Sequence, residues 1–276
     1  MPRVAVDLTP VLPGGENGGA KTATLALIAS LPRIAPEWEF LLLTSHRSHD
    51  ELAPLDAPGV RRLCVADAPA RGSGVTRAAR RALETLAPRP VLEQMVRGYR
   101  SLLGAAGRGL LAQLGADLLF SPFLSPLFYE AGVPSVVVVT DLQFRFYPQF
   151  FDRNERRHRQ RSFRAACRCA SRLVCISDYV KGTVIELGRV APDRCVRIYL
   201  GARGRLAARP DAAVYQRWAL TPGEYLLYPA NFWPHKNHER LLAAFARYVQ
   251  RVPRSRLKLM CCGAPGPHEH RVRQAA

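Results

Sequence analysis

A cluster of polar and basic residues near position 230 separates an apolar run from an amphipathic one. In YLLYPANFWPHKNHERLLAAF, residues 225–245, a strand pattern leads into an aromatic loop, and a helix pattern follows at once. Lys236 stands where that strand ends and the helix begins, a place that suits neutralisation of a diphosphate. With it in the loop stand Asn231, His235, Asn237 and His238. We expect these polar side chains to contact a ligand.

A glycine-rich loop, PGGENGGAKT, lies between the first apolar run and the first helical run. Glycines there let backbone amides approach a ligand, and the start of a helix favours anions. The loop is neither GxGxxG nor GxxxxGK[ST], because Lys21 lies two positions past the last glycine. A tight turn without a ligand would have the same composition, so both interpretations stay open. The glycines are Gly14, Gly15, Gly18 and Gly19.

An aspartate follows the most β-branched run of the chain. In VVVVTDLQFRFYPQFF, Asp141 comes directly after a predicted buried strand. Ligand groups gather at the carboxyl ends of parallel strands, so Asp141 could orient a substrate hydroxyl. It could equally cap the next turn.

A serine begins another helical run. Ser177 is predicted to be an N-cap, because its hydroxyl can accept a bond from an early backbone N–H of a helix running through Leu187. Lys181 is expected to face the same end of the sheet.

Alternating strand and helix patterns indicate an α/β fold with parallel strands. The pattern restarts at Tyr225, so the domain junction is predicted at residues 207–222, between domains at 1–206 and 223–276. One β-α-β unit of ~50 residues buries too little apolar surface to be stable alone, and we therefore expect the chain to be C-terminally truncated. The strands are predicted at Val4–Leu8, Glu39–Thr44, Val60–Val65, Asp117–Phe120, Ser135–Thr140, Arg172–Ile176, Arg194–Tyr199, 225–230 and 257–263, and the longer helices at Ala20–Leu31, Arg153–Cys169 and Glu239–Gln250.

Composition narrows the class of protein. The hydrophobic fraction of 48% is ordinary for a globular chain. No apolar run reaches the ~18–20 residues of a membrane-spanning helix, and the N-terminus lacks a signal-peptide pattern. We therefore expect a cytoplasmic protein. The seven cysteines form no CxxC pair, which favours buried, reduced thiols over metal ligands.

The net charge of +18 comes from 36 Arg and 4 Lys, a bias that a GC-rich genome also produces. Residues 71–115 hold eight Arg against two Glu, with apolar residues at helical spacing. This pattern fits a solvated basic face, or a basic amphipathic surface that rests on an anionic membrane. Nucleic acid is not expected as a partner, because no zinc module and little aromatic interleaving are present.

Together, these segments resemble glycosyltransferase family 4, the retaining GT-B enzymes that transfer sugars from nucleotide diphosphate donors. The resemblance covers nearly the whole chain, and the loop PANFWPHKN is similar to that of mannosyltransferase-like members. It implies an N-terminal, acceptor-side Rossmann-like domain and the first β-α-β unit of a C-terminal donor domain. It also implies no metal and no cofactor beyond the nucleotide-sugar substrate.

By this resemblance, the four glycines match the loop where sugar–phosphate and acceptor meet, and Asp141 matches the aspartate of an HD pair. Ser177 and Lys181 match the family's serine segment, and Lys236 its donor-diphosphate lysine. Gly263 matches the glycine that closes the next strand.

The chain departs from the family pattern at three points. Thr140 stands where the family usually has the histidine of the HD pair. Asn231 stands where the family most commonly has the arginine of a Gly-Arg pair that opens the donor domain. The family's E-x7-E segment is absent from the 276 residues. The implied reaction is transfer of a hexose from a UDP- or GDP-sugar, mannose favoured, to a glycan or lipid-linked acceptor. The alternative is a truncated or degenerate, non-catalytic domain that binds acceptor, partner or membrane.

Overall fold

The computed structural model describes residues 1–66, 109–201, 212–266 and 268–276. The chain divides into two compact units. The first contains Met1–Val11 and Thr24–Tyr199, and the second contains Leu12–Ala23 and Leu200–Ala276. The basic amphipathic surface was predicted at residues 71–115, of which 71–108 lie outside the described residues, so that prediction stays open.

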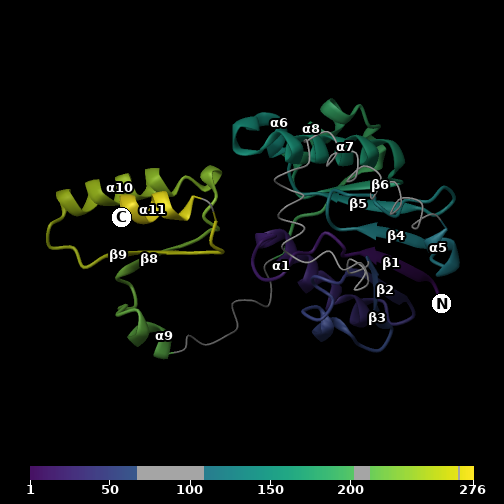
Figure 1. The fold of residues 1–276 in the computed structure, drawn as a ribbon, viewed down its shortest axis with the longest axis horizontal. Coiled ribbons are helices and arrows are strands. Elements are labelled where there is room, and N and C mark those ends of the chain that lie inside the picture. Colours follow the sequence, from purple (N-terminus) through teal and green to yellow (C-terminus); the bar gives the residue numbers. More distant parts are fainter. Residues whose placement is uncertain (67–108, 202–211, 267) are drawn as a thin grey trace, which may run out of the picture. The chain divides into compact units, whose positions relative to one another are not determined.

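A parallel sheet of seven strands forms the centre of the first unit, in the order β3-β2-β1-β4-β5-β6-β7. Figure 1 shows this ladder from β3 to β6. The β-branched and leucine-rich runs form these strands because their side chains pack well on a pleated, buried surface. The strands are β1 (Arg3–Asp7), β2 (Glu39–Ser45), β3 (Val60–Ala66), β4 (Leu118–Ser121), β5 (Ser135–Val139), β6 (Arg172–Cys175) and β7 (Cys195–Arg197).

Parallel strands need crossover connections. Helices form them after β1, β5 and β6, whereas only a 3₁₀ turn lies between β2 and β3 and no helix lies between β4 and β5. The longest, α7, begins after Asp152, whose carboxylate accepts bonds from the backbone N–H groups of Asn154 and Glu155. The helices are α1 (Gly18–Ile28), α2 (Leu31–Ile34), α5 (Leu110–Gln113), α6 (Gln143–Phe146), α7 (Arg153–Cys169) and α8 (Asp178–Gly188). Short 3₁₀ turns are η1 (Ala53–Leu55), η2 (Pro148–Phe150) and η3 (Pro192–Arg194).

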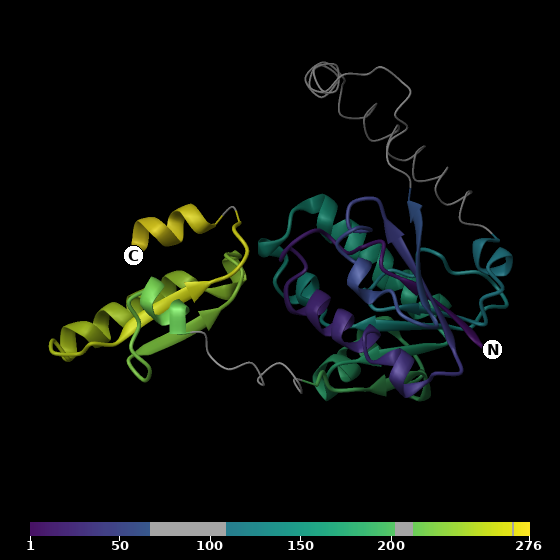
Figure 2. The ribbon, with the colours of Figure 1, turned by 90° about the horizontal axis from the view of Figure 1, so that it is seen from below.

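Apolar side chains cover both faces of the first unit's sheet. Alternate residues of β1 point to opposite faces: Val4 and Val6 pack with Ile28 of α1, whereas Ala5 packs with Leu119 and Leu111. A further cluster joins β5 and β6 to α7 and α8. Figure 2 shows α1, in purple, beside the blue strands. Burial on both faces explains why the strands read as nearly unbroken apolar runs.

The strand order reverses direction between β1 and β4. The chain moves outward from β1 through β2 to β3, and then returns to the other side of β1 as β4. In open parallel sheets, ligands bind outside the carboxyl ends of the strands at such a switch point. The carboxyl ends of β1 and β4 are therefore the first place to look for function in this unit.

The second unit contains one β-α-β cycle. Strands β8 (Tyr225–Pro229) and β9 (Lys258–Cys262) pair in parallel, with Tyr225 opposite Lys258 and Pro229 opposite Cys262, and both views show them side by side. The helices are α9 (Ala212–Arg217), α10 (His238–Arg251) and α11 (Glu269–Ala275), with the 3₁₀ turn η4 (Pro234–Lys236) before α10.

Most predicted elements are confirmed, with shifts at their ends. The helix Arg153–Cys169 has the predicted bounds, and α10 begins one residue earlier than predicted, at His238. The last strand of the first unit was predicted through Tyr199 but ends at Arg197. Ile198 and Tyr199 are exposed at the edge of the sheet, so their apolar character does not reflect a buried strand. No helix within the described ranges is long and apolar enough to cross a membrane.

Candidate functional site

A buried carboxylate ends strand β1 at the switch point. Asp7 is 1% exposed, and its Oδ1 accepts hydrogen bonds from the backbone N–H of Thr9 at 3.0 Å and from the Thr9 hydroxyl at 2.6 Å. Burial raises the pKa of Asp7 to about 6, against the lowering effect of the two Thr9 bonds. The other oxygen, Oδ2, is buried and has no hydrogen-bond partner among the described residues.

The neighbouring strand places a second unpartnered polar atom beside it. Val6 pairs with Phe120, and the next residues on the two strands are Asp7 and Ser121. The Ser121 hydroxyl is also buried without a hydrogen-bond partner in the described part of the chain. Buried polar atoms usually have partners, so this pair marks a polar position suited to a ligand or an ordered water.

Sequence reasoning missed both residues. Asp7 follows a buried strand just as Asp141 does, so the same argument could have found it. Ser121 has no such signal, because its place beside Asp7 depends on the strand order.

The glycine loop after β1 is closed by a lysine. Lys21 is 5% exposed, and its ammonium donates to the carbonyl oxygens of Leu12 at 2.8 Å and Gly14 at 2.9 Å. The Asn17 side chain accepts from the backbone N–H of Leu12 at 2.6 Å. The loop therefore has a defined shape held by its own residues.

Two of the four predicted glycines have a backbone that other residues rarely adopt. Gly14 has φ +63° and Gly18 has φ +56°, in the left-handed region that glycine enters without a steric cost. The Gly18 N–H donates to the carbonyl of Gly15 at 2.9 Å, and a side chain at Gly19 would meet open space. The backbone conformation of the turn explains why glycine occupies positions 14 and 18. At Gly19 the surrounding space would also accommodate a larger residue.

Asp141 lies at the carboxyl end of β5, where the sequence places it. It is exposed, and its Oδ1 accepts from the backbone N–H of Gln143 at 3.0 Å, at the start of α6. One oxygen of Asp141 thus caps the next turn, which was one of the two roles that the sequence left open. The same carboxylate remains at the surface of the sheet's carboxyl edge, beside the chain that enters α6.

The predicted N-cap at Ser177 is confirmed. Its hydroxyl accepts from the backbone N–H of Val180 at 3.2 Å and begins α8. Lys181 lies in the first turns of α8, half-buried, and its charge acts on the thiols of Cys175 and Cys195. Burial nevertheless raises the pKa of both thiols, that of Cys175 to about 11.

In the second unit, the loops that follow β8 and β9 lie against each other. The Ala230 N–H donates to the Cys262 carbonyl at 2.8 Å, and Asn231 Oδ1 accepts from the Ala264 N–H at 2.9 Å. A Cβ on Gly263 would lie 2.3 Å from the Ala230 carbonyl oxygen, so only glycine fits there. The side chain of Asn231 therefore joins the two loops, and Gly263 permits their close approach.

Lys236 lies in the turn η4, directly before α10. Its carbonyl accepts from the Tyr228 hydroxyl at 2.7 Å, and its ammonium makes no hydrogen bond or ion pair with residues that the structure describes. Asn237 follows with φ +58° as the N-cap of α10, but its side chain does not cap the helix. The His235 ring lies 5.5 Å from the ring of Trp233.

His238, the first residue of α10, is buried among aromatic rings. Its ring stacks on Phe232, with centroids 4.9 Å apart, and meets Tyr228 edge-on at 5.1 Å. Neither ring nitrogen has a hydrogen-bond partner of good geometry within the described ranges. Burial lowers the pKa of His238. This histidine packs in the small core of the unit and does not extend into solvent.

The burial of the cysteine thiols is uneven. The prediction of buried thiols is confirmed for Cys167, Cys175 and Cys195 and is wrong for Cys64 and Cys262, which are exposed. Within the described residues, no three metal-ligating side chains lie together.

Comparisons with known proteins identify the fold. No family model and no curated protein matches the chain. Among solved structures, HepE from Anabaena, in complex with UDP and glucose, has a TM-score of 0.60 at 16% identity, over 100% of this chain and 66% of that one. The chain has the GT-B fold. It spans about two thirds of the HepE chain.

Two further solved structures share the fold, with similar TM-scores and similarly low sequence identity. A glycosyltransferase from Rickettsia africae has a TM-score of 0.54 at 11% identity, over 99% of this chain and 64% of that one. UDP-N-acetylglucosamine 2-epimerase from Rickettsia bellii has a TM-score of 0.52 at 9% identity, again over 99% and 64%. Because one of the two is a transferase and the other an epimerase, the fold alone does not choose between these reactions.

Proposed function

We propose that the chain is part of a glycosyltransferase that transfers a hexose from a nucleotide diphosphate sugar to a glycan or lipid-linked acceptor. The donor is a UDP- or GDP-sugar, with mannose as the favoured sugar, and the anomeric configuration is retained. The proposal rests on the GT-B fold, on the solved HepE complex with UDP and glucose and on the resemblance of the loop 230–237 to family 4.

The observation that carries the proposal is the ammonium of Lys236, which has no partner among the described residues, beside a helix that its N-cap residue Asn237 does not cap. Asn237 leaves the first backbone N–H groups of α10 without a side-chain acceptor. The N-terminus of a 14-residue helix also carries partial positive charge. A lysine and a free helix N-terminus together form a site for a phosphate group.

This arrangement suits the chemistry of sugar transfer. When the bond between sugar and diphosphate breaks, negative charge grows on the departing diphosphate. A nearby ammonium and the fixed backbone dipoles of a helix N-terminus stabilise that charge. Lys236 would supply the charge and α10 the amides, so this step would require no metal ion.

Asp141 is the candidate for the acceptor side. Its carboxylate lies at the carboxyl edge of the first unit's sheet, and the Gln143 N–H already holds Oδ1. A carboxylate fixed in this way can accept a hydrogen bond from a sugar hydroxyl and orient it. Asp141→Asn keeps the capping acceptor and removes the charge. It is therefore expected to lower the transfer rate more than it lowers donor affinity.

The direct test is calorimetric titration of the chain with UDP-glucose, GDP-mannose and uridine. We expect saturable binding of at least one nucleotide sugar and no binding of uridine, because uridine lacks the diphosphate. Equal binding of uridine, or no binding of any nucleotide sugar, would refute the proposal. Proton NMR of the glycoside product would then show whether the anomeric configuration of the donor is kept.

The second candidate is a non-catalytic domain of the same fold that binds acceptor, partner or membrane. The departures from the family pattern at Thr140 and Asn231 favour it. It predicts donor or acceptor binding without turnover, so nucleotide release measured with and without acceptor sugars distinguishes the two. Conversion of UDP-N-acetylglucosamine to its 2-epimer would instead support the reaction of the Rickettsia bellii relative.

A further inference from the structure

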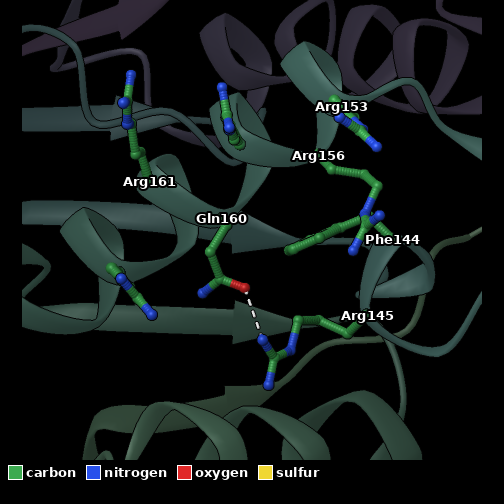
Figure 3. Close-up of a pocket in the computed structure, with 8 residues that line it drawn as sticks. Phe144, Arg145, Arg153, Arg156, Gln160 and Arg161 are labelled. Carbon is green, nitrogen blue, oxygen red and sulfur yellow. Dashed lines mark hydrogen bonds between the residues drawn. The ribbon is translucent and has the colours of Figure 1, made fainter. Parts of the chain in front are cut away.

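Helices α6 and α7 of the first unit enclose a hollow of about 520 Å³ that is lined by arginine. Phe144 of α6, which is 3% exposed, forms an apolar part of its wall. Figure 3 shows the side chain of Arg145 directed at Gln160, with their hydrogen bond dashed, and Arg156 near Phe144. The six arginines are Arg145, Arg153, Arg156, Arg157, Arg161 and Arg164.

Five of the six arginines belong to one face of α7. Most of them are three or four residues apart, which places them on one face of the helix, and the eleven steps from Arg153 to Arg164 span about 16 Å. The opposing turn, α6, adds Arg145. The buried residues of α7, among them Phe163 and Ala166, pack into the core. The helix therefore has separate apolar and cationic faces.

The positive charge of the hollow is not neutralised within it. None of the residues lining it is acidic. Arg145 donates to Gln160 Oε1 at 2.9 Å, and the other five guanidinium groups make no hydrogen bond or ion pair in the part of the chain that the structure describes. Glu155, the acid in the first turn, pairs with Arg159 at 2.8 Å, outside the hollow.

We propose that this hollow binds a diphosphate group carried by the acceptor. Guanidinium groups match phosphate oxygens with paired, charge-assisted hydrogen bonds. A stripe of about 16 Å is longer than one phosphate needs, which favours two linked phosphates. Bringing six like charges together is unfavourable, and a bound polyanion relieves that repulsion.

The position of the hollow points to the acceptor. Phe144 and Arg145 of its wall belong to α6, whose first backbone N–H is held by Asp141. Asp141 is the residue assigned above to the acceptor hydroxyl, so this inference rests on the proposed function. An acceptor with its diphosphate in the hollow would have its sugar end near that carboxylate. The class of acceptor is thus a sugar or lipid linked through a diphosphate.

The test is calorimetric titration of the whole chain with inorganic pyrophosphate, and with sulfate as the single-anion control. We expect pyrophosphate to bind more tightly than sulfate. The double substitution Arg156→Ala with Arg157→Ala should weaken pyrophosphate binding at least tenfold. Arg168→Ala, on the same helix but outside the hollow, should leave the affinity unchanged and is the control for helix charge.

Other outcomes would overturn the inference. If pyrophosphate does not bind, or binds equally to the double variant, the hollow is not a diphosphate site. If only phosphatidylglycerol vesicles bind in an arginine-dependent way, the helix is a membrane-docking surface instead. Donor binding at Lys236 is measured separately, by titration with a nucleotide sugar. A chain that binds pyrophosphate through the arginines but no nucleotide sugar would disprove the proposed function and keep this site.

Discussion

The hydroxyl of Tyr228 donates a hydrogen bond to the backbone carbonyl of Lys236 at 2.7 Å. Tyr228 belongs to strand β8, whereas Lys236 belongs to the turn that leads into α10. The bond fixes the backbone from which the lysine ammonium extends, and that ammonium has no partner of its own among the described residues. The strand thus fixes the backbone position of Lys236, the residue proposed to bind the donor diphosphate.

Tyr228→Phe should weaken nucleotide-sugar binding although Tyr228 is not placed against the donor. Loss of one neutral hydrogen bond costs about 1 kcal/mol, which corresponds to about a fivefold loss of affinity. The measurement is the dissociation constant for the nucleotide sugar. Tyr248→Phe removes the hydroxyl that contacts Ser255 at 3.0 Å, seven residues further along the chain. This control should leave the dissociation constant unchanged.

Gly263→Ala should disrupt the second unit. The added methyl would lie 2.3 Å from the Ala230 carbonyl oxygen and 2.7 Å from Cα of Asn231, both backbone atoms. Overpacking of this kind costs about 1–3 kcal/mol or more. Hydrogen exchange in β8 and β9 should therefore accelerate while exchange in the first unit stays the same.

The matched control is Gly182→Ala, in α8 of the first unit. A Cβ at Gly182 would meet no atom within 4 Å. Alanine in a helix interior is favoured over glycine by about 1 kcal/mol, so this change should raise stability. If Gly263→Ala were equally harmless, the close approach of the two loops would be wrong.

Asp7→Asn should change how stability depends on pH. The pKa of Asp7 is raised from 3.8 to about 6 in the folded chain. Between these values the folded state holds the proton more firmly than the unfolded state, so stability falls as pH rises from about 4 to about 6. A shift of this size corresponds to about 3 kcal/mol. The asparagine variant lacks the titrating proton.

The measurement is urea unfolding of both chains at several pH values. The difference in unfolding free energy between wild type and Asp7→Asn should change across that interval and level off above pH 6. A constant difference would show that Asp7 is not a buried carboxyl with a raised pKa. The asparagine Oδ1 can still accept both Thr9 bonds, so the comparison leaves those contacts in place.

His238→Phe should remove an acid sensitivity of the second unit. Burial lowers the pKa of His238, so below about pH 6.5 the unfolded chain takes up a proton that the folded chain does not. Wild-type stability in this unit should therefore fall as pH decreases through 6. Phenylalanine keeps a ring for stacking on Phe232 and cannot titrate. Hydrogen exchange in α10 at pH 5 and 7 measures the effect, which would be the same in both chains if His238 were solvated.

The elements of the fold could be predicted well from the sequence because their patterns are local. The apolar runs of β2 and β5 and the capped helices at Asp152 and Ser177 are each encoded in a few neighbouring residues. Strand ends were less certain. The run through Tyr199 is apolar but leaves the sheet at its exposed edge, and nothing in its composition distinguishes the two environments.

The candidate site depends on order in space, which local patterns do not contain. Ser121 lies beside Asp7 only because β4 pairs with β1 and not with β3. The helix of the arginine stripe was predicted with its bounds, but its hollow requires α6 on the other side. The Oδ1 of Asn231 joins two loops through Ala264, which lies 33 residues further along the chain. Its predicted contact with the donor stays a prediction.

The most direct test of the central claim uses the tryptophan next to the proposed diphosphate site. The chain has three tryptophans. The backbone carbonyl of Trp233 accepts a hydrogen bond from the backbone N–H of Lys236 at 2.9 Å. In 5-fluorotryptophan-labelled chain, the fluorine signal of Trp233 should shift saturably with UDP while that of Trp38 stays fixed. Lys236→Met should abolish the shift, and Arg251→Met, at the far end of α10, should preserve it. A Trp233 signal that ignores UDP, or responds equally in Lys236→Met, would contradict the claim that this loop binds the donor diphosphate.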